Sequence, residues 1–400
     1  MPAVEIKPGI FWIGVNDRTT DLFEGIWPIT DEGVTYNSYL INDEKKVIID
    51  LSKAIKSDVF FDNVTELIEL SRLDYIVINH MEPDHTGVFQ MFRKIAPHVT
   101  ILGTAKTKEM LKNFYGITEN VRAIEDGETL SLGKYQLKFF NTPFVHWPET
   151  MMTLEEKTGI LFSCDGFGSY GALQGSIFDD QCENIDFYKR EALRYYVNIV
   201  GKFSGPVLKA IEKLPAEEVK VVAPSHGLVW RKFPAEIISL YRKWAEYASG
   251  SGDIGVTLLY GSMYGNTEIM MNAVAQGISS EGVPVEIFDV ARTHTSYMLP
   301  SLWTKAGVMV GAPTYEGACF PPMVHAVSMA IRKRVLNKKL TIFGSYGWSG
   351  GALRELKRIV EPGKWELLDS YVFLGKPDSE DLKKGEEFGR NFARALKEQA

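Results

Sequence analysis

The sequence predicts an α/β protein of two domains, a mixed-sheet domain followed by a doubly wound parallel sheet. A chain of 400 residues is too long for one ordinary hydrophobic core. Apolar, β-rich runs alternate with helix-like stretches in both halves of the chain. A short Gly- and Ser-rich segment, residues 247–253, separates two stretches that each carry a full set of elements.

The domain boundary is expected within this segment. A helix is predicted over residues 234–247, just before it, and an apolar strand over residues 254–260, just after it. We therefore expect a first domain at residues 1–250 and a second at residues 254–400.

The first domain is expected to contain short strands that are covered by helices. The predicted strands are residues 9–15, 35–41, 46–50, 73–79, 99–103, 135–140, 159–163 and 219–223. The early strands follow one another closely and the later ones alternate with helix-like stretches, which indicates mixed sheets. The second domain alternates strand and helix more regularly, a pattern that is typical of a doubly wound parallel sheet.

The composition excludes several classes of function. The net charge is −7, whereas a nucleic-acid-binding surface needs an excess of Lys and Arg. No apolar stretch is long enough to cross a bilayer, and residues 1–15 lack the pattern of an export signal. Cys164, Cys182 and Cys319 lie far apart, which argues against an iron–sulfur centre or a fused rubredoxin module. We therefore expect a soluble, cytoplasmic protein that binds neither nucleic acid nor membrane.

Four side chains that can bind metal lie within six residues, where a strand is expected to end. They belong to the run His80-Met81-Glu82-Pro83-Asp84-His85, which follows the apolar residues 75–78. Three further candidates also follow predicted strands: His146, Asp165 and His226. Because the carboxyl ends of neighbouring parallel strands meet at one edge of a sheet, we expect these side chains to converge. A mixed set of imidazoles and carboxylates suits iron better than zinc.

Each part of this cluster also has a simpler interpretation. A single histidine after a strand, such as His226, is more often a loop or core residue than a ligand. Glu82 and Asp84 could form a solvated turn. The spacing from Glu82 to His85 also matches the Glu-x-x-His motif of helical-bundle di-iron proteins, but Pro83 opposes a continuous helix and the sequence has no second copy. Because the six-residue run and the three further candidates all follow predicted strands, a metal site is favoured over these simpler interpretations.

Three loops of the second domain follow successive predicted strands and share glycine, hydroxyl and aromatic residues. The first runs into a helix predicted over residues 268–279, whose N-terminus would hold a phosphate. The other two place aromatic rings and glycines where backbone can approach a flat ring system. This order resembles the FMN-binding flavodoxins, and the first turn lacks a Gly-x-Gly-x-x-Gly dinucleotide motif. The predicted FMN-binding residues are Ser262, Met263, Tyr264, Gly265, Asn266, Thr267, Pro313, Thr314, Tyr315, Glu316, Gly317, Ser345, Tyr346, Gly347, Trp348, Ser349 and Gly350.

Together these motifs resemble the flavodiiron proteins over nearly the whole chain. The resemblance rests on His80-x-Glu82-x-Asp84-His85, His146-Trp147-Pro148, Asp165 and Pro224-Ser225-His226-Gly227, with Thr35-Tyr36-Asn37 nearer the start. It implies a metallo-β-lactamase-like αββα domain followed by a flavodoxin-like domain. It also implies that one iron is held by His80, Glu82 and His146, the other by Asp84, His85 and His226, and that Asp165 bridges them.

The resemblance implies an oxidoreductase that reduces dioxygen to water, nitric oxide to nitrous oxide, or both. FMN would receive the electrons and pass them to the two non-haem irons. A flavin and two irons together store the four electrons that dioxygen needs, whereas a pair of nitric oxide molecules needs two. Three carboxylates and a bridging hydroxide would balance two divalent ions, which supports the assignment of iron.

The expected partners are an external electron donor and a second copy of the chain. Rubredoxin is the common donor of similar proteins, reduced coenzyme F420 serves some relatives, and another flavin reductase system is a third candidate. Members of the family form head-to-tail homodimers, or dimers of dimers, in which the FMN of one subunit lies beside the di-iron site of the other. We expect the same arrangement here.

A few positions depart from the family pattern or stay open. Glu24 precedes Gly25, where many family members have a histidine, so a carboxylate would replace an imidazole if this loop lines the substrate pocket. Tyr195, or Tyr196, is predicted to offer a catalytic hydroxyl, although a packed helix aromatic fits the position equally well. Cys164 either tunes the site or only packs beside it.

Two other classes of function stay open from the sequence alone. The first is a zinc-dependent metallo-β-lactamase-like hydrolase with a fused flavodoxin-like domain, which predicts bound zinc and an activity that is insensitive to flavin reduction. The second is a non-catalytic electron carrier in which the metals only stabilise the fold. In the second domain, Tyr315 and Trp348 could be packing residues rather than flavin contacts.

Overall fold

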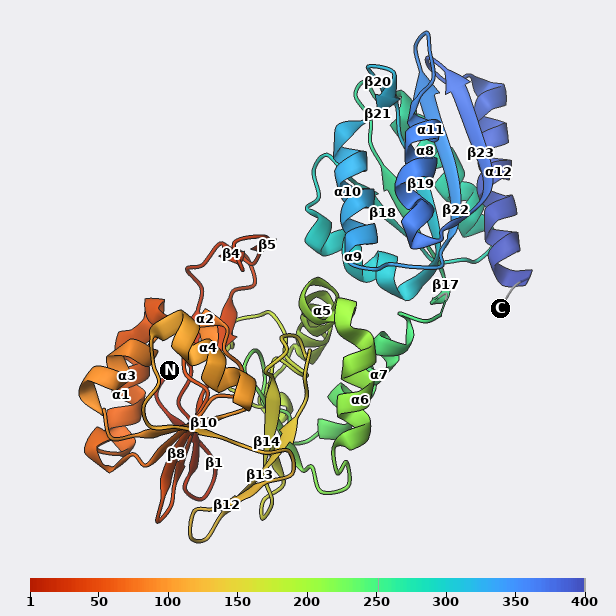
Figure 1. The fold of residues 1–400 in the computed structure, drawn as a ribbon. Coiled ribbons are helices and arrows are strands. Elements are labelled where there is room, and N and C mark those ends of the chain that lie inside the picture. The colour runs from red at the N-terminus through yellow and green to blue at the C-terminus, as the bar shows by residue number, and fades with distance from the viewer. Residues whose placement is uncertain (251, 399–400) are drawn as a thin grey trace. The chain divides into compact units, whose positions relative to one another are not determined.

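The computed structural model describes residues 1–250 and 252–398 (Figure 1). Contacts within the chain divide it into two compact units, Met1–Ala245 and Glu246–Ala400. Ser251, inside the predicted boundary segment, lies outside the described residues. Each unit has its own sheets and its own hydrophobic core.

The first unit contains two large sheets. The seven-stranded sheet has the order β1-β2-β7-β8-β9-β10-β11; its pairs are antiparallel from β1 to β8 and parallel from β8 to β11. These strands are β1 (Val4–Lys7), β2 (Ile10–Trp12), β7 (Tyr39–Asn42), β8 (Lys46–Ile49), β9 (Tyr75–Val77), β10 (Thr100–Gly103) and β11 (Val121–Ala123). The five-stranded sheet has the order β12-β13-β14-β15-β16, and only its last pair is parallel. These strands are β12 (Thr129–Ser131), β13 (Gln136–Asn141), β14 (Met151–Glu155), β15 (Ile160–Cys164) and β16 (Val221–Pro224).

Helices cover the outer faces of both sheets, so the first unit has four layers, helix–sheet–sheet–helix (Figure 1). One helical layer is α1 (Ser57–Leu67), α3 (Phe89–Ile95) and α4 (Ala105–Tyr115), and the other is α5 (Ile185–Tyr195), α6 (Ser204–Lys213) and α7 (Pro234–Glu246). Side chains of the two sheets meet between them, as the rings of Tyr39 on β7 and Phe162 on β15 do, with centroids 5.0 Å apart. The αββα prediction is confirmed.

Short elements connect these layers. Two small ribbons join β3 (Val15–Asp17) to β6 (Val34–Tyr36) and β4 (Leu22–Phe23) to β5 (Trp27–Pro28). A single helical turn, α2 (Pro83–Thr86), follows β9. The short helical turns are η1 (Ala54–Lys56), η2 (Leu70–Arg72), η3 (Asp179–Gln181), the π-helical η4 (Tyr196–Val200) and η5 (Gly201–Phe203).

Two of the predicted strands are in fact broken. Residues 9–15 form β2 and the start of β3, and residues 35–41 form parts of β6 and β7. The break has a local cause: the Asn37 backbone N–H donates to Ser225 O (2.7 Å), and its side chain accepts a hydrogen bond from Trp12 Nε1 (2.8 Å). Because Asn37 makes these bonds, it does not pair with a neighbouring strand, and the strand is interrupted between β6 and β7. Strands β11, β12 and β14 were not predicted, because β11 and β12 have only three residues each and β14 is buried on both faces without alternation.

The second unit is a doubly wound parallel sheet, as predicted. Its strand order is β18-β17-β19-β22-β23 and every pair is parallel, which is the flavodoxin order. The strands are β17 (Asp253–Tyr260), β18 (Val285–Asp289), β19 (Lys305–Gly311), β22 (Lys339–Tyr346) and β23 (Glu366–Leu374), with a small hairpin of β20 (Thr314–Tyr315) and β21 (Ala318–Cys319). The helices are α8 (Asn266–Ser280), α9 (Thr295–Thr304), α10 (Pro321–Arg332), α11 (Ala352–Val360), α12 (Ser379–Glu398) and the turn η6 (Glu361–Gly363).

A buried lysine just before β22 gives the second unit a predicted pH dependence. Lys338 is 1% exposed, and its Nζ donates to Trp303 O (2.9 Å) and Lys305 O (2.6 Å). Burial lowers the pKa of Lys338 to about 7. Because this folded-state pKa lies below the unfolded value of 10.5, the unfolded chain binds more protons between these two values. The free energy of unfolding therefore rises with pH in that window, by roughly 1 kcal/mol from pH 7 to 8.

Lys338→Met is expected to remove this rise. The measurement is urea unfolding of the second unit between pH 7 and 9, followed by the fluorescence of its tryptophans. Lys339→Met is the matched control, because the neighbouring Lys339 is only half-buried and pairs with the exposed Glu366. An equal slope in the wild type and in Lys338→Met would contradict the assignment.

Candidate metal centre and flavin pocket

The predicted metal ligands come from the ends of neighbouring strands and converge on one place. His80 and Glu82 follow β9, and Asp84 and His85 lie on the single turn α2. His146 follows β13, Asp165 follows β15 and His226 follows β16. The structure thus brings all seven side chains together, from both large sheets of the first unit.

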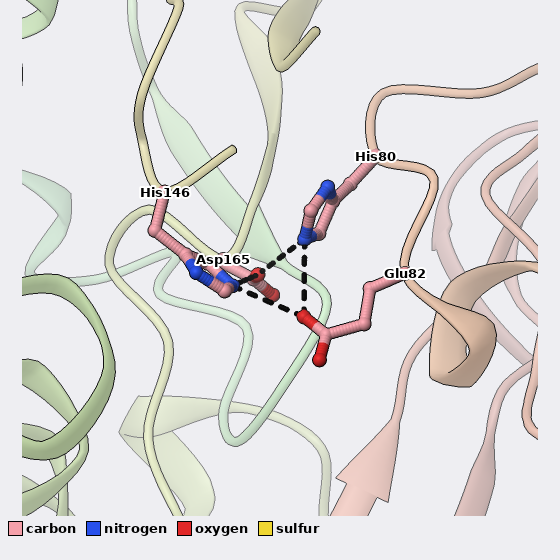
Figure 2. Close-up of side chains that lie close together, drawn as sticks. All are labelled: His80, Glu82, His146 and Asp165. Carbon is pink, nitrogen blue, oxygen red and sulfur yellow. Dashed lines mark hydrogen bonds and ion pairs between the residues drawn. The ribbon is translucent and has the colours of Figure 1, made fainter. Parts of the chain in front are cut away.

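The seven side chains form two groups that share Asp165. On one side, Asp165 Oδ2 lies 3.3 Å from His80 Nε2 and 3.1 Å from His146 Nε2. Glu82 Oε2 completes this group, at 3.2 Å and 3.1 Å from the same two nitrogens (Figure 2). Each residue of the group therefore points a single ligand atom at the others.

The second group uses the other oxygen of the same carboxylate. Asp165 Oδ1 lies 3.1 Å from His85 Nε2 and 3.3 Å from His226 Nε2. Asp84 reaches the same nitrogens, with Oδ1 at 3.3 Å from His85 and Oδ2 at 3.4 Å from His226. Asp165 is thus placed between two sets of ligand atoms, with one oxygen toward each.

Both groups fit a pair of metal ions. His85 Nε2, His226 Nε2, Asp84 Oδ1 and Asp165 Oδ1 are buried and have no well-aligned hydrogen-bond partner among the described residues. Buried polar atoms without partners are costly, and a metal ion is one of the few things that satisfies several at once. Imidazole nitrogens and carboxylate oxygens are also the donors that non-haem iron takes.

Charge pairing dominates the electrostatics of the centre. Burial disfavours the charged imidazole, but the close carboxylates outweigh it, Asp165 with Glu82 for His146 and Asp165 with Asp84 for His226, and raise the pKa of His146 to about 9 and that of His226 to about 10. The same interactions hold the pKa of Asp165 well below its usual range, against the opposite effect of burial. A metal ion must displace these protons, so binding it releases protons to solvent.

Three residues for which the sequence predicted no role support the ligands. Glu149 is buried and its Oε1 lies 2.7 Å from His80 Nδ1 and 2.9 Å from the Met81 amide nitrogen. The carbonyl oxygen of Thr35 lies 2.6 Å from His226 Nδ1. Such partners fix the orientation of an imidazole and leave its other nitrogen free for a metal. Phe23 is the third, and its ring packs edge-on against His226 with centroids 5.4 Å apart.

The structure shows what surrounds Glu24, Cys164 and Tyr195, whose roles the sequence left open. Glu24 is exposed and accepts a hydrogen bond from Trp27 Nε1 (3.1 Å), so its neighbour Phe23 faces the centre instead. Cys164 is buried with its sulfur close to His85 and Asp165, and burial raises the pKa of the thiol well above its usual value. Tyr195 is fully buried against His226, with ring centroids 5.6 Å apart.

The three predicted flavin loops surround two adjoining cavities in the second unit. The first cavity, about 370 Å³, is lined by eleven of the predicted residues: Met263, Tyr264, Asn266, Pro313, Thr314, Tyr315, Glu316, Ser345, Tyr346, Gly347 and Trp348. The second, about 440 Å³, adds Ser349 and Gly350. Both volumes lie in the range of cofactor pockets.

The remaining predicted flavin residues shape the loops rather than line these two cavities. Thr267 and Ser345 join the first loop to the third through a hydrogen bond between their hydroxyls (2.9 Å). Ser262 Oγ accepts a hydrogen bond from the Gly265 amide (3.0 Å), and α8 begins at Asn266, two residues earlier than predicted. Gly317 turns the small hairpin at φ +75°.

Two aromatic side chains of this pocket are almost fully exposed, and Tyr315 is 40% exposed. Trp348 is 91% exposed and Tyr264 is 89% exposed. Large aromatic side chains are rarely left so open unless a ligand or partner covers them. The packing interpretation of Trp348 is therefore wrong, and the loops fit a flat, phosphate-bearing cofactor with its phosphate at the N-terminus of α8.

Comparisons with known proteins agree with both sites. A family model described as "ODP family beta lactamase" matches residues 34–227, and a flavodoxin model matches residues 258–387. The chain is 35% identical to the "Anaerobic nitric oxide reductase flavorubredoxin" of Escherichia coli over 399 residues, which is 98% of this chain and 82% of that protein. The protein of the same name from Salmonella arizonae is equally similar.

Solved structures show the same architecture across both units. The rubredoxin oxygen:oxidoreductase from the anaerobe Desulfovibrio gigas has a TM-score of 0.93 at 27% identity and covers 99% of each chain. The flavodiiron protein from Giardia intestinalis has a TM-score of 0.94 at 28% identity and covers 100% of this chain and 97% of its own.

Because the relatives are oxidoreductases, the hydrolase and the non-catalytic carrier are not favoured. The identity over almost the whole chain, the paired family models and the converging ligands have one common explanation. The chain belongs to the flavodiiron proteins and is an oxidoreductase with FMN and a non-haem di-iron centre as its cofactors.

Proposed function

We propose that this flavodiiron protein reduces dioxygen to water, nitric oxide to nitrous oxide, or both. Electrons would pass from an external donor through FMN to the di-iron centre. The observation that carries the proposal is Asp165, which turns one carboxylate oxygen toward each of two ligand groups. The names of the Escherichia coli and Desulfovibrio gigas relatives, a nitric oxide reductase and an oxygen oxidoreductase, support the two substrates.

The ligand roles follow from the two groups. His80, Glu82 and His146 would hold one iron, and Asp84, His85 and His226 the other, with Asp165 bridging the two. The irons and the flavin supply the electrons, and the protein supplies ligation, orientation and a buried site. Glu149 would keep His80 in the tautomer that leaves Nε2 free for metal.

The flavin roles are divided among the three loops. Ser262–Thr267 would hold the phosphate at the N-terminus of α8, since backbone N–H groups there point outward. Pro313–Gly317 and Ser345–Gly350 would flank the ring system, with Tyr315 and Trp348 against its faces. In this proposal, residues 1–250 form the di-iron domain and residues 254–400 the FMN-binding domain.

The finer partners are part of the same proposal. Rubredoxin is the donor named by the Desulfovibrio gigas relative; reduced coenzyme F420 and another flavin reductase system are the alternatives. A head-to-tail homodimer, or a dimer of dimers, would set one subunit's FMN beside its partner's di-iron centre. No helix of the described residues is long and apolar enough to span a membrane. The three cysteines are free, which fits the proposed cytoplasmic location.

The decisive experiment starts with the metal and flavin content of one purified sample. About two irons and one FMN per chain are expected. Reduced protein is then mixed rapidly with dioxygen and with nitric oxide, and flavin reoxidation is followed by absorbance. Zinc that persists after expression with ample iron, or a flavin that neither gas reoxidises, would overturn the proposal. For the dimer, a fully active monomer in light scattering would do so.

Tyr195 tests whether a buried hydroxyl takes part in the reaction. Its hydroxyl has no hydrogen-bond partner among the described residues. Tyr195→Phe is therefore expected to leave the melting temperature and iron content unchanged. If the hydroxyl donates to the bound substrate, turnover falls by about tenfold or more.

Tyr196→Phe is the matched control, because the Tyr196 hydroxyl bonds to Ser204 Oγ at 2.7 Å. This variant is expected to lose stability and to keep its turnover per di-iron centre. Unchanged turnover of both gases in Tyr195→Phe would show that Tyr195 is only a packed aromatic.

A further inference from the structure

The rings of Phe23 and Tyr195 pack on His226, which belongs to the second ligand group, and the ring of Tyr170 packs against both of them. The Phe23 ring lies 5.4 Å from His226 and 5.4 Å from Tyr170, and Tyr195 lies 5.6 Å from His226 (centroid distances). Tyr170 and Tyr195 also contact each other, at 5.1 Å. These three residues, here called the aromatic cluster, are buried and exclude water from this side of His226.

Phe23 reaches the cluster from a very small hairpin. Its strands, β4 and β5, have two residues each. The flanking side chains Leu22 and Ile26 are 45% and 51% exposed, so they contribute little burial. A two-stranded ribbon of this size is not stable by itself in water. The burial of Trp27 in β5 (2% exposed) and contacts from outside the hairpin must therefore together hold Phe23 against His226.

Arg194, in the last turn of α5, makes that connection. It is 2% exposed, and its Nη1 donates to the carbonyl oxygen of Pro28 in β5 (2.8 Å). Its Nη2 pairs with Glu32 beyond the hairpin (3.3 Å), and its Nε donates to Glu191 on its own helix (2.7 Å). The guanidinium also lies over the ring of Tyr170, at 4.5 Å from the centroid.

These contacts link Arg194 to two members of the aromatic cluster, and the third is its neighbour in the chain. The guanidinium binds the hairpin that carries Phe23 and stacks on Tyr170, and Arg194 directly precedes Tyr195. Its planar fork fixes several directions at once, which the single ammonium group of a lysine does not. Because Arg194 is buried and its partners are buried or half-buried, each hydrogen bond is worth more than one at the surface.

We propose that Arg194 is a positioning residue for the reaction at the second ligand group. It holds the β4–β5 hairpin so that Phe23 stays packed on His226 and the Tyr195 hydroxyl keeps its place beside the centre. The proposal rests on the function proposed above, because it gives the aromatic cluster a role in gas reduction. It does not depend on which of the two gases is the substrate.

The test compares Arg194→Met with Arg194→Lys in the full protein loaded with FMN and iron. Hydrogen exchange is measured at the hairpin amides of Ile26 and Ile29, which bond to Phe23 O and Asp21 O. In Arg194→Met, exchange there is expected to speed up by about tenfold or more, with the iron content unchanged. The kcat per di-iron centre is expected to fall by about tenfold while KM stays near the wild-type value, because a misplaced group slows chemistry more than binding.

Arg194→Lys is expected to recover only part of both effects, since it keeps the charge and loses the fork. Lys189→Met is the matched control on the same helix, because Lys189 pairs with Glu236 (2.6 Å) in a half-exposed position. It should change neither readout. If Arg194→Met does not fold because Glu191 is left unpaired, the double variant Arg194→Met with Glu191→Leu removes that charge and is measured in the same way.

Each possible result tests a different part of the proposal. Wild-type exchange at Ile26 and Ile29 would show that Arg194 does not hold the hairpin, and the proposal would be wrong. Faster exchange with wild-type kcat would show that it only stabilises the fold, which also overturns the positioning role. A wild-type protein that reduces neither gas would remove the proposed function, whereas the exchange experiment would still test the hairpin contact.

Discussion

Asp165→Asn is expected to abolish gas reduction. An amide keeps the shape of the side chain but is uncharged and has one oxygen, so one ligand group loses its Asp165 oxygen and both lose the negative charge that they share. We expect the iron content to fall below two per chain and turnover with either gas to fall by roughly a thousandfold or more. Iron analysis and stopped-flow reoxidation of the reduced flavin measure the two effects.

Asp17→Asn is the matched control for this prediction. Asp17 is also a fully buried carboxylate of the first unit, but it binds the hydroxyls of Thr19 and Thr20, away from the ligand groups. Its variant should lose stability and keep both irons. Asp165→Asn with two irons and normal turnover would show that the two groups do not act through a shared carboxylate.

Gly351→Ala is expected to release FMN. A Cβ on Gly351 would overlap the carbonyl oxygen of Gly317, so the two loops that flank the flavin cavity could no longer lie against each other. Backbone cannot move aside as a flexible side chain can, so the overlap must spread the loops. We expect FMN affinity to fall by about a hundredfold, near 3 kcal/mol, as measured by fluorescence titration of the apoprotein with FMN.

Gly350→Ala provides the control one residue away. A Cβ on Gly350 would meet nothing within 4 Å, although this glycine also lines the larger cavity. It should bind FMN nearly as well as the wild type. Equal affinities of the two variants would mean that the spacing of these loops does not determine flavin binding.

The positions of the candidate ligands could be read from the sequence because strand ends share an edge. Each of the seven side chains lies within about five residues after the end of a strand or on the single turn α2. Pro83 was expected to oppose a continuous helix, and α2 is indeed a single turn. Proline suits its first position, where the missing N–H would have had no partner.

The supporting residues could not be predicted in the same way. Glu149 lies three positions after His146 but binds His80, which precedes it by sixty-nine positions, so only the folded sheets bring the pair together. Phe23 belongs to a two-residue strand, too short for alternation to show which neighbour faces inward. The sequence pattern therefore pointed to Glu24, whereas the adjacent Phe23 is the residue whose ring contacts His226.

The origin of the ligands has a consequence for folding as well as for chemistry. His80, Glu82, Asp84 and His85 follow a strand of the seven-stranded sheet, whereas His146, Asp165 and His226 follow strands of the five-stranded sheet. Bound metal would therefore cross-link the two sheets at their common edge and close long loops between them, as a pair of disulfides would. A chain without its irons would keep its hydrophobic core but lose this cross-link between the sheets. Iron supply would therefore also affect the lifetime of the folded protein in the cell.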